Sequence, residues 1–480
     1  MILETADIRA ARADALAAAA LEFDGGGFQH TLARRIAHRT ESQNPERAGA
    51  LHAYLSDEIA PSLSALGMHS EVFDNPIAGK QPLLIGRRIE DASLPTVLVY
   101  GHGDVVRGLE GRWRDGLDPW RLSAQGDRWY GRGSADNKGQ HSINIAALAA
   151  VLAARGGRLG FNLTWLVEMG EETGSPGLAE FCRTHREALS ADVLIASDGP
   201  RLRADRPTVY LGTRGVANFD LTLKLRDGGH HSGNWGGLLR NPGTVLSHAI
   251  ASLVDSRGAI IIDALRPPPI PPAVKRALAD IEVGGGADDP AIDADWGEPG
   301  LTPAERVFGW NTIEVLAVGV GNPAQPVNAI PHEARATLQL RFVVGTDASH
   351  LREHVRSHLR QRGFMDIEVS EPVVMAATRL DPDNDWVRLA LRSIEQTTGQ
   401  RPALLPNLGG SLPNDVFADI LGLPTVWVPH SYPACSQHAP NEHVLAPLMR
   451  EGLMMMTGLF YDLGEQATTL PRRARAKETS

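Results

Sequence analysis

The stretch that decides the fold is Thr96-Val97-Leu98-Val99-Tyr100-Gly101-His102-Gly103-Asp104. It begins with a mostly apolar run bounded by turn residues, which is typical of a strand buried on both faces. The periodicity that follows predicts a helix over 140–154, a strand over 161–167, a helix over 177–188 and a strand over 192–196. This βαβα order predicts an α/β domain with a mainly parallel sheet and helices on both faces.

The pattern changes near Gly212. Residues 216–225 alternate apolar and polar side chains, as a half-exposed antiparallel strand does. Further patterns predict strands over 313–318 and 334–344, helices over 238–254 and 349–362, and irregular connections over the Pro-, Gly- and Asp-rich stretch 256–310. After Asp381 the α/β rhythm returns, with a helix over 385–397, a strand over 424–428 and a helix over 445–459. We therefore expect an α/β domain in two parts, residues 1–211 and 381–463, interrupted by an inserted α+β domain over 212–380 and followed by a flexible tail over 464–480.

The composition is that of an ordinary globular chain. It has 480 residues, of which 42% are hydrophobic and 22% charged, and a formal net charge of -10. The length predicts more than one core, and the acidic balance argues against a dedicated nucleic-acid binder. Cys182 and Cys435 are the two cysteines, too few for a disulfide framework or a cysteine-based zinc site. Without a signal-peptide pattern or an apolar run of about 18 residues, we expect a cytoplasmic protein with no membrane or nucleic-acid partner.

Acidic and histidine residues follow the predicted strands at their carboxyl ends, where open α/β sheets bind ligands. They are His102-Gly103-Asp104, Asp136 in the glycine-rich loop 131–139, Glu171-Glu172, Asp198, and His438 within 436–443. Each segment also has a plainer interpretation: a phosphate loop, a solvated acidic turn, a simple turn or a surface histidine. The loop 131–139, however, fits neither of the common phosphate-binding fingerprints.

Together these residues offer nitrogen and oxygen ligands without sulfur, a set that suits zinc or manganese. Two cations about 3.5–4 Å apart, bridged by one carboxylate, polarise a carbonyl and activate water. Of Glu171 and Glu172, one can coordinate a cation while the other stays free as a base.

These motifs resemble the dinuclear zinc-dependent exopeptidases and amidohydrolases. That family includes carnosine-type dipeptidases, aminoacylases, glutamate carboxypeptidases and succinyl-diaminopimelate desuccinylase. The resemblance covers about residues 10–463 and rests on His102-x-Asp104, Asp136-Asn137-Lys138-Gly139, Glu171-Glu172, Asp198 and His438-x-x-Asn441-Glu442. The chain is most similar to the cytosolic non-specific dipeptidase branch, through Tyr130-Gly131-Arg132-Gly133, Gly212-Thr213-Arg214-Gly215 and His231-Ser232-Gly233 with Gly236-Gly237.

The resemblance implies a role for each residue of the metal centre. His102, Asp136 and Asp198 hold one cation. Asp136 bridges to a second cation, which Glu172 and His438 also hold. Asp104 orients His102, and Glu171 is the general base. The implied cofactors are two divalent ions, Zn²⁺ with Mn²⁺ or Co²⁺ as alternatives.

The resemblance also implies that residues 212–380 form a lid through which the chain makes a homodimer. His231, with His230 as the competing candidate, reaches the partner's site and stabilises the oxyanion. Arg341 binds the substrate's free carboxylate, and its plainer interpretation is a salt-bridged surface arginine. Asn328, where the family leads us to expect Thr, and Gly410 with Ser411 complete the substrate contacts.

The leading hypothesis is a metal-dependent peptidase that hydrolyses the amide bond of a dipeptide or similarly small peptide with a free C-terminal carboxylate. An N-acyl-amino-acid amidohydrolase that uses the same site is the alternative. Asp198, where the family's deacylases more usually have Glu, favours the peptidase. A non-catalytic dimeric binding protein is the hypothesis of another class, and the complete ligand set argues against it.

Overall fold

The structure is a computed structural model that describes residues 5–284, 290–410 and 412–473. The chain divides into two compact units. Unit 1 comprises Met1–Leu211, Leu380–Leu405 and Pro413–Ser480, and unit 2 comprises Gly212–Arg379 and Pro406–Leu412. Unit 2 therefore contains a short segment, Pro406–Leu412, that lies outside the inserted stretch expected from the sequence.

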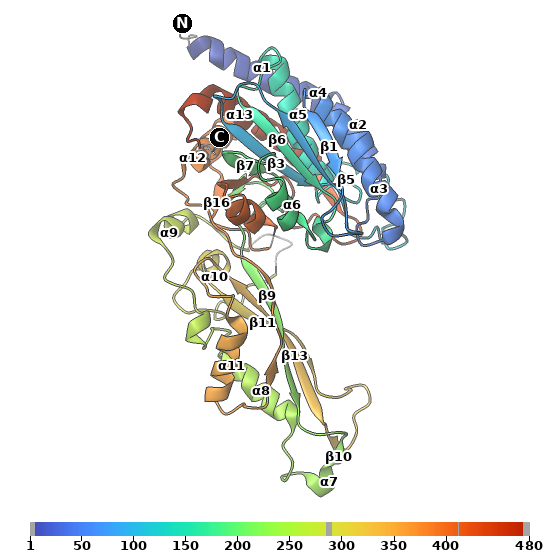
Figure 1. Ribbon diagram of the computed structural model, residues 1–480, viewed down its shortest axis with the longest axis vertical. Coiled ribbons are helices and arrows are strands. Elements are labelled where there is room, and N and C mark those ends of the chain that lie inside the picture. The colour runs from blue at the N-terminus through green and yellow to red at the C-terminus, as the bar shows by residue number, and fades with distance from the viewer. Residues whose placement is uncertain (1–4, 285–289, 411, 474–480) are drawn as a thin grey trace. The chain divides into compact units, whose positions relative to one another are not determined.

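Unit 1 is built on an eight-stranded sheet within the described ranges, with the strand order β1-β2-β6-β3-β7-β17-β8-β16 (Figure 1). The strands are β1 His69–Phe73, β2 Leu83–Arg88, β3 Thr96–His102, β6 Asn162–Glu168, β7 Val193–Ala196, β8 Thr208–Tyr210, β16 Ala403–Leu405 and β17 Thr425–Trp427. The central run β6-β3-β7-β17 is parallel, while β1 and β2 pair antiparallel at one edge. The predicted α/β class with a mainly parallel sheet is confirmed.

Helices cover both faces of this sheet. They are α1 Thr5–Asp24, α2 Gly27–Ala37, α3 Ala48–Ala53, α4 Ala60–Ala65, α5 Lys138–Ala154, α6 Leu178–Thr184, α12 Asp385–Thr398 and α13 Ala446–Gln466, with π-helical turns at Tyr54–Ile59 and Val416–Ile420. Strand β3 shows how its sequence serves both faces. Val97 and Val99 join the apolar core that contains α5 and α13, whereas the Tyr100 ring packs against Phe417 on the other side. A strand with two buried faces has no polar side to alternate with, which is why its sequence is a continuous apolar run.

The parallel register brings three strand ends to one edge of the sheet. His102, the last residue of β3, pairs with Glu168, the last residue of β6, and β7 ends nearby at Ala196. A small sheet of β4 Ser123–Gln125, β5 Arg128–Tyr130 and β18 His443–Leu445 joins two segments that are distant in the sequence. These connections place the loops after β3, β6 and β7 together with residues 131–139 and 436–442.

Unit 2 has an antiparallel sheet with the order β11-β13-β9-β14, and β15 also pairs with β9. Its strands are β9 Gly215–Lys224, β11 Thr312–Gly319, β13 Glu333–Phe342, β14 Glu368–Val369 and β15 Val373–Met375, and β10 His230–His231 pairs separately with β12 Ala329–Ile330. Helices α8 Pro242–Leu253 and α11 Leu351–Gln361 pack on one face of the sheet, and their apolar side chains form one core with the inward residues of β9 and β13. Short helices α7 Ser232–Trp235, α9 Pro272–Leu278 and α10 Pro303–Phe308 complete the unit.

Three differences from the sequence expectation are local. Helix α8 begins at Pro242 because Asn241 caps it, accepting a hydrogen bond from Gly243 N, so the helix starts later than position 238. The stretch 256–310 contains α9 and α10 rather than irregular connections alone.

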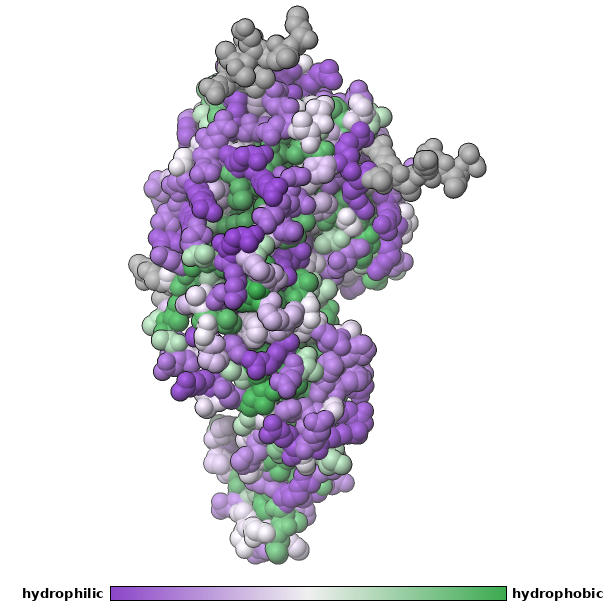
Figure 2. All heavy atoms as spheres, turned by 90° about the vertical axis from the view of Figure 1, so that its left-hand side faces the viewer, coloured by the Kyte–Doolittle hydropathy of each residue, from purple (hydrophilic) through white to green (hydrophobic). Residues whose placement is uncertain are grey.

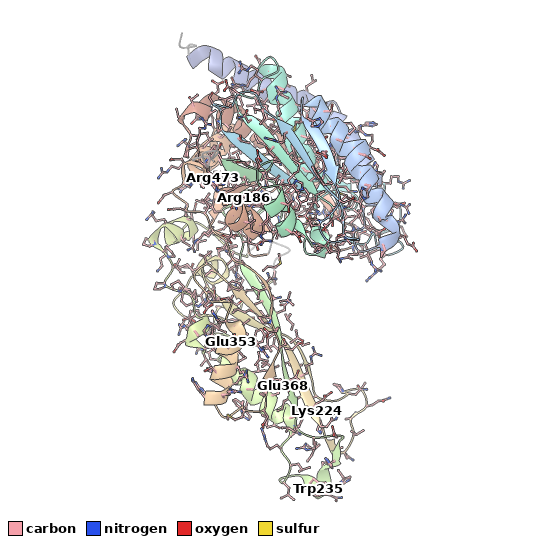
Figure 3. The ribbon with its side chains drawn as sticks, viewed as in Figure 1. Arg186, Lys224, Trp235, Glu353, Glu368 and Arg473 are labelled. Carbon is pink, nitrogen blue, oxygen red and sulfur yellow. The ribbon has the colours of Figure 1, made fainter. Side chains whose placement is uncertain are left out.

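The third difference concerns the expected tail. Helix α13 runs past Gly464 to Gln466, and Arg473, labelled in Figure 3, donates through its backbone N–H to Asp192 Oδ1 at 2.7 Å and through its side chain to Leu421 O at 2.7 Å. Part of the expected tail thus forms a helical turn and makes hydrogen bonds with the rest of unit 1, and residues 474–480 lie outside the described residues. No helix in the described part of the chain is both long and apolar enough to cross a bilayer.

Candidate metal centre

The first group of ligands consists of His102, Asp136 and Asp198, all buried. His102 Nε2 lies 2.9 Å from Asp136 Oδ1 and 3.5 Å from Asp198 Oδ2. His102 ends β3 and Asp198 follows β7, so two neighbouring parallel strands supply two of the three side chains.

The second group consists of Asp136, Glu172 and His438. His438 Nε2 lies 2.9 Å from Asp136 Oδ2 and 3.0 Å from Glu172 Oε2. The Asp136 carboxylate therefore presents Oδ1 to the first group and Oδ2 to the second. This is the arrangement that a bridging carboxylate between two cations requires.

The donor atoms fit divalent cations on observations that do not depend on sequence motifs. Among the described residues, Asp198 Oδ2 is buried and makes no hydrogen bond. Burial and the nearby charge of Asp136 raise the pKa of Asp198 to about 6 and that of Glu172 to about 7. Buried carboxylates crowded in this way repel one another, and a cation between them would offset both the repulsion and the burial cost.

The histidines complete the electrostatic picture. Hydrogen bonds with Asp136 and Glu172 raise the pKa of His438 to about 10. Burial alone would raise the pKa of Asp136, but hydrogen bonds from His102 and His438 hold it far below its usual range. The two imidazoles thus lie against the carboxylates whose charge a pair of bound cations would also offset.

Glu171 belongs to neither group. Its Oε2 lies 4.0 Å from His102 Nε2, and its side chain keeps 16% of its surface exposed. Burial, together with the charges of Asp198, Asp136 and Glu172, raises its pKa well above the usual value. A carboxylate beside the ligands with access to solvent suits a group that exchanges protons with a reacting water.

Asp104 makes contacts on two sides. His102 Nδ1 lies 3.1 Å from the Asp104 main-chain oxygen and 3.4 Å from its Oδ1. The Asp104 carboxylate also accepts hydrogen bonds from the backbone N–H groups of Glu171 at 3.2 Å and Glu172 at 3.1 Å. The expected contact with His102 is present, and the same side chain also holds the loop that carries both glutamates.

Sequence reasoning assigned no role to two residues that touch Asp136. The Gln437 side-chain amide donates to Asp136 Oδ2, and Glu442, which is buried, accepts from the Asp136 backbone N–H at 3.2 Å. Gln437 directly precedes His438, and Glu442 ends the motif His438-x-x-Asn441-Glu442, so the motif itself was the available signal for Glu442.

The other predicted site residues lie in unit 2. His231 on β10 pairs with Ala329, and Ser232 N donates to Asn328 O at 3.0 Å, so His231 and Asn328 are brought together. His230 pairs with Ile330 and is half-buried. The β10–β12 pair lies at the end of unit 2 where Figure 3 labels Trp235. Figure 2 shows hydrophobic residues on the surface at this end.

Arg341 lies elsewhere in unit 2, on β13. Its Nε donates to Gln339 Oε1 at 2.8 Å, and Gln339 Nε2 donates to Asn218 Oδ1 at 2.9 Å. Gly410 is exposed within the segment Pro406–Leu412, and Ser411 lies outside the described residues.

Comparison with known proteins decides the family. Residues 98–462 match the sequence profile of peptidase family M20/M25/M40. The chain belongs to this family. It is thus a metallopeptidase, and the family predicted from the sequence motifs is confirmed.

Individual relatives agree with this assignment. A cysteinylglycine-S-conjugate dipeptidase of Corynebacterium striatum is 27% identical over 402 residues, which cover 80% of this chain and 83% of that protein. A succinyl-diaminopimelate desuccinylase of Methylobacterium radiotolerans is 29% identical over 385 residues, 78% of this chain and 82% of that protein. The crystal structure of human carnosine dipeptidase 1 shares the fold, with a TM-score of 0.72 and 23% identity over 95% of this chain and 99% of that one.

Proposed function

We propose that this family member is a dinuclear metallodipeptidase that hydrolyses the amide bond of a dipeptide or similarly small peptide with a free C-terminal carboxylate. The observation that carries the proposal is the Asp136 carboxylate facing two ligand groups, with Glu171 outside both. The dipeptidase relative supports this substrate class.

Two divalent cations, Zn²⁺ with Mn²⁺ or Co²⁺ as alternatives, would supply Lewis acidity toward the scissile carbonyl and lower the pKa of water. His102, Asp136 and Asp198 would hold one, and Asp136, Glu172 and His438 the other. Glu171 takes the proton from the attacking water and returns it to the leaving nitrogen, so one carboxylate serves as base and then as acid. The Asp104 carboxylate keeps Glu171 in place by accepting a hydrogen bond from the Glu171 backbone N–H.

Arg341 is the proposed site for the substrate carboxylate. The chain of hydrogen bonds from Arg341 Nε to Gln339 and on to Asn218 orients the guanidinium plane. A planar guanidinium held in this way can meet a carboxylate with two parallel hydrogen bonds, which a lysine cannot do. Gly410, Ser411 and Asn328 are proposed as further substrate contacts.

Unit 2 is the proposed lid and dimerisation domain. Its edge strand β11 exposes Val315, Leu316 and Val318, which is unusual for an edge strand that faces only water. A homodimer through this unit would let the exposed His231 act in the partner's active site, where it would stabilise the oxyanion.

The desuccinylase relative favours one competing activity, the hydrolysis of N-acyl amino acids. Both reactions use the same ligands and base, because both cleave an amide through attack by water. They differ in what lies on the acyl side of the bond, an amino acid in one and a simple acid in the other.

The deciding experiment assays the metal-loaded protein on a dipeptide panel, including Cys-Gly and β-Ala-His, beside a panel of N-acyl amino acids. We expect cleavage of the dipeptides. Cleavage of the acyl panel alone would support the deacylase instead, and cleavage of neither panel would point to a non-catalytic binding protein.

The base is tested separately with Glu171→Gln, which keeps the shape of the side chain but cannot accept the proton. We expect kcat to fall about 10²–10⁴-fold with unchanged metal content, whereas Glu180→Gln, a change of an exposed glutamate in the same region, should have no effect. Full activity in the Glu171 variant would remove Glu171 from the mechanism.

A further inference from the structure

A carboxylate buried beneath the metal centre binds the backbone of the loop that presents Asp136. Glu442 is 1% exposed. Its Oε1 accepts from the backbone N–H of Ala135 at 2.9 Å and of Asp136 at 3.2 Å. Its Oε2 accepts from the Gly133 N–H at 3.1 Å and from Arg132 Nη1 at 2.7 Å.

The two chain segments that meet here are joined at further points. Arg132 Nη2 donates to Ala439 O at 3.1 Å, and Gly131 N donates to Glu442 O at 3.0 Å. Beyond them, His443 pairs with Tyr130 in the small sheet of β18 and β5. Residues 130–136 and 439–443 therefore form one continuous set of contacts.

Two of the three ligands of the second group, Asp136 and His438, lie at the ends of this set. His438 immediately precedes Ala439, and its Nε2 meets Asp136 Oδ2 at 2.9 Å. Arg132, Glu442 and Ala439 thus close a ring of contacts that begins and ends at the Asp136–His438 pair. A shift of either segment along the other would change the separation of these two ligands.

The chemistry of Glu442 fits this task. Three N–H groups of a loop without regular secondary structure converge on its two oxygens, and a carboxylate is the side chain that accepts only. The charge of Arg132 offsets the cost of burying the carboxylate. A glutamine would place its amide N–H groups against the two donors that one of these oxygens accepts from.

We propose that Glu442 is a positioning residue of the metal centre, which holds Asp136 and His438 at the separation that the second cation requires. The inference rests on the two-cation centre of the proposed function. Residues that orient metal ligands in this way typically contribute about 10- to 100-fold to metal affinity.

The experiment titrates the metal-free full-length protein with Zn²⁺ alone by calorimetry. His438→Ala identifies the binding step that belongs to the second ligand group, because that step is lost in it. In Glu442→Gln we expect the same step to weaken about 10- to 100-fold, while the step assigned to His102, Asp136 and Asp198 changes less.

Glu41→Gln is the matched control. Glu41 is also buried in unit 1, but its carboxylate holds the Gly108 N–H and Arg47 instead of the Asp136 loop. We expect Glu41→Gln to lower the melting temperature, as Glu442→Gln does, and to leave both Zn²⁺-binding steps unchanged. Equal weakening in the two variants, or unchanged Zn²⁺ binding in Glu442→Gln, would overturn the proposal.

Arg132→Lys decides the matter if Glu442→Gln does not fold. It keeps the positive charge but cannot contact Glu442 and Ala439 together, so the same binding step should weaken, though less. Unaltered binding in Arg132→Lys would then overturn the proposal. A wild-type protein that binds two cations but hydrolyses no peptide would defeat the proposed function and leave this inference standing.

Discussion

The candidate metal-ligand region of unit 1 and the proposed recognition residues of unit 2 are organised in opposite ways. His102, Asp136 and Asp198 are buried and contact one another. His231 and Arg341, by contrast, stand on different strands of unit 2, one exposed and one half-buried. The candidate ligand groups are assembled by the fold of a single unit, whereas the residues proposed for recognition stand on a separate unit and would act only with a substrate or, as proposed, a second copy of the chain. Substitutions should therefore be most severe in the first region and graded in the second.

The largest effect is expected from Asp136→Asn. The substitution preserves shape but removes the charge that faces both ligand groups, so both cations should be bound far more weakly and hydrolysis should fall to background. Metal analysis of the dialysed protein and a peptide assay measure the two consequences. Asp192→Asn, which changes a buried aspartate that holds Thr96 N, is the control and should retain metal. If Asp136→Asn retains its metal, substitutions in the ligand region are not more severe than those in unit 2, and the contrast between the two regions fails.

The next effect concerns the exposed end of unit 2. If His231 donates to the oxyanion, His231→Ala should lower kcat about 10²–10³-fold without loss of metal. His230→Ala, a change of the adjacent half-buried histidine, should have little effect. Mixing His231→Ala with Glu171→Gln should restore part of the activity, because one active site of the mixed dimer then has both residues. Absence of restoration would argue that His231 does not act in the partner's site.

A smaller effect is expected from changing the residue that orients Arg341. Gln339→Leu removes the acceptor that orients Arg341 Nε, a hydrogen bond worth about 0.5–1.5 kcal/mol. KM should rise roughly 2- to 10-fold while kcat stays unchanged, since the chemistry lies in unit 1. Thr337→Val on the same strand provides the comparison. A fall in kcat with constant KM would mean that Arg341 does not act through substrate binding.

The last effect concerns stability rather than activity: the metal-free protein should show a pH dependence of its free energy of unfolding. The pKa is raised to about 7 for Glu172 and to about 6 for Asp198 in the folded state. Between about pH 4 and 7 the folded protein therefore holds protons that the unfolded chain has released, and the free energy of unfolding falls as pH rises. Denaturant titrations across this range should show the decline, and saturating Zn²⁺ should reduce it. A flat profile without metal would contradict the crowding of carboxylates.

Much of the metal centre could be predicted from the sequence because parallel strands end at a common edge of the sheet. The apolar runs of β3 and of the strand before Glu171 each stop at a polar or glycine residue, which marks where the strand ends. His102 and the glutamate pair could therefore be placed near each other. His438 lies far from them in the sequence. Its position after the predicted strand over 424–428 made it a candidate ligand, and its place at the second cation came from the resemblance.

The remaining contacts could not be predicted, since no local pattern encodes which backbone donor a buried carboxylate will meet. Asp104 holds the N–H groups of Glu171 and Glu172, and Glu442 holds those of the Asp136 loop. Both arrangements join segments whose proximity arises only when the sheet and the β5–β18 ribbon have formed.

The sequence by itself determined the class of fold, the ligand chemistry and the interruption of the α/β domain, because hydrophobic periodicity and residue type are local properties. Tertiary structure alone decided that Asp136 turns one oxygen to each ligand group, that Pro406–Leu412 joins unit 2, and that Arg473 makes a hydrogen bond with Asp192. These features depend on contacts between residues hundreds of positions apart, and the free energy of such contacts is set by packing and burial rather than by any one segment.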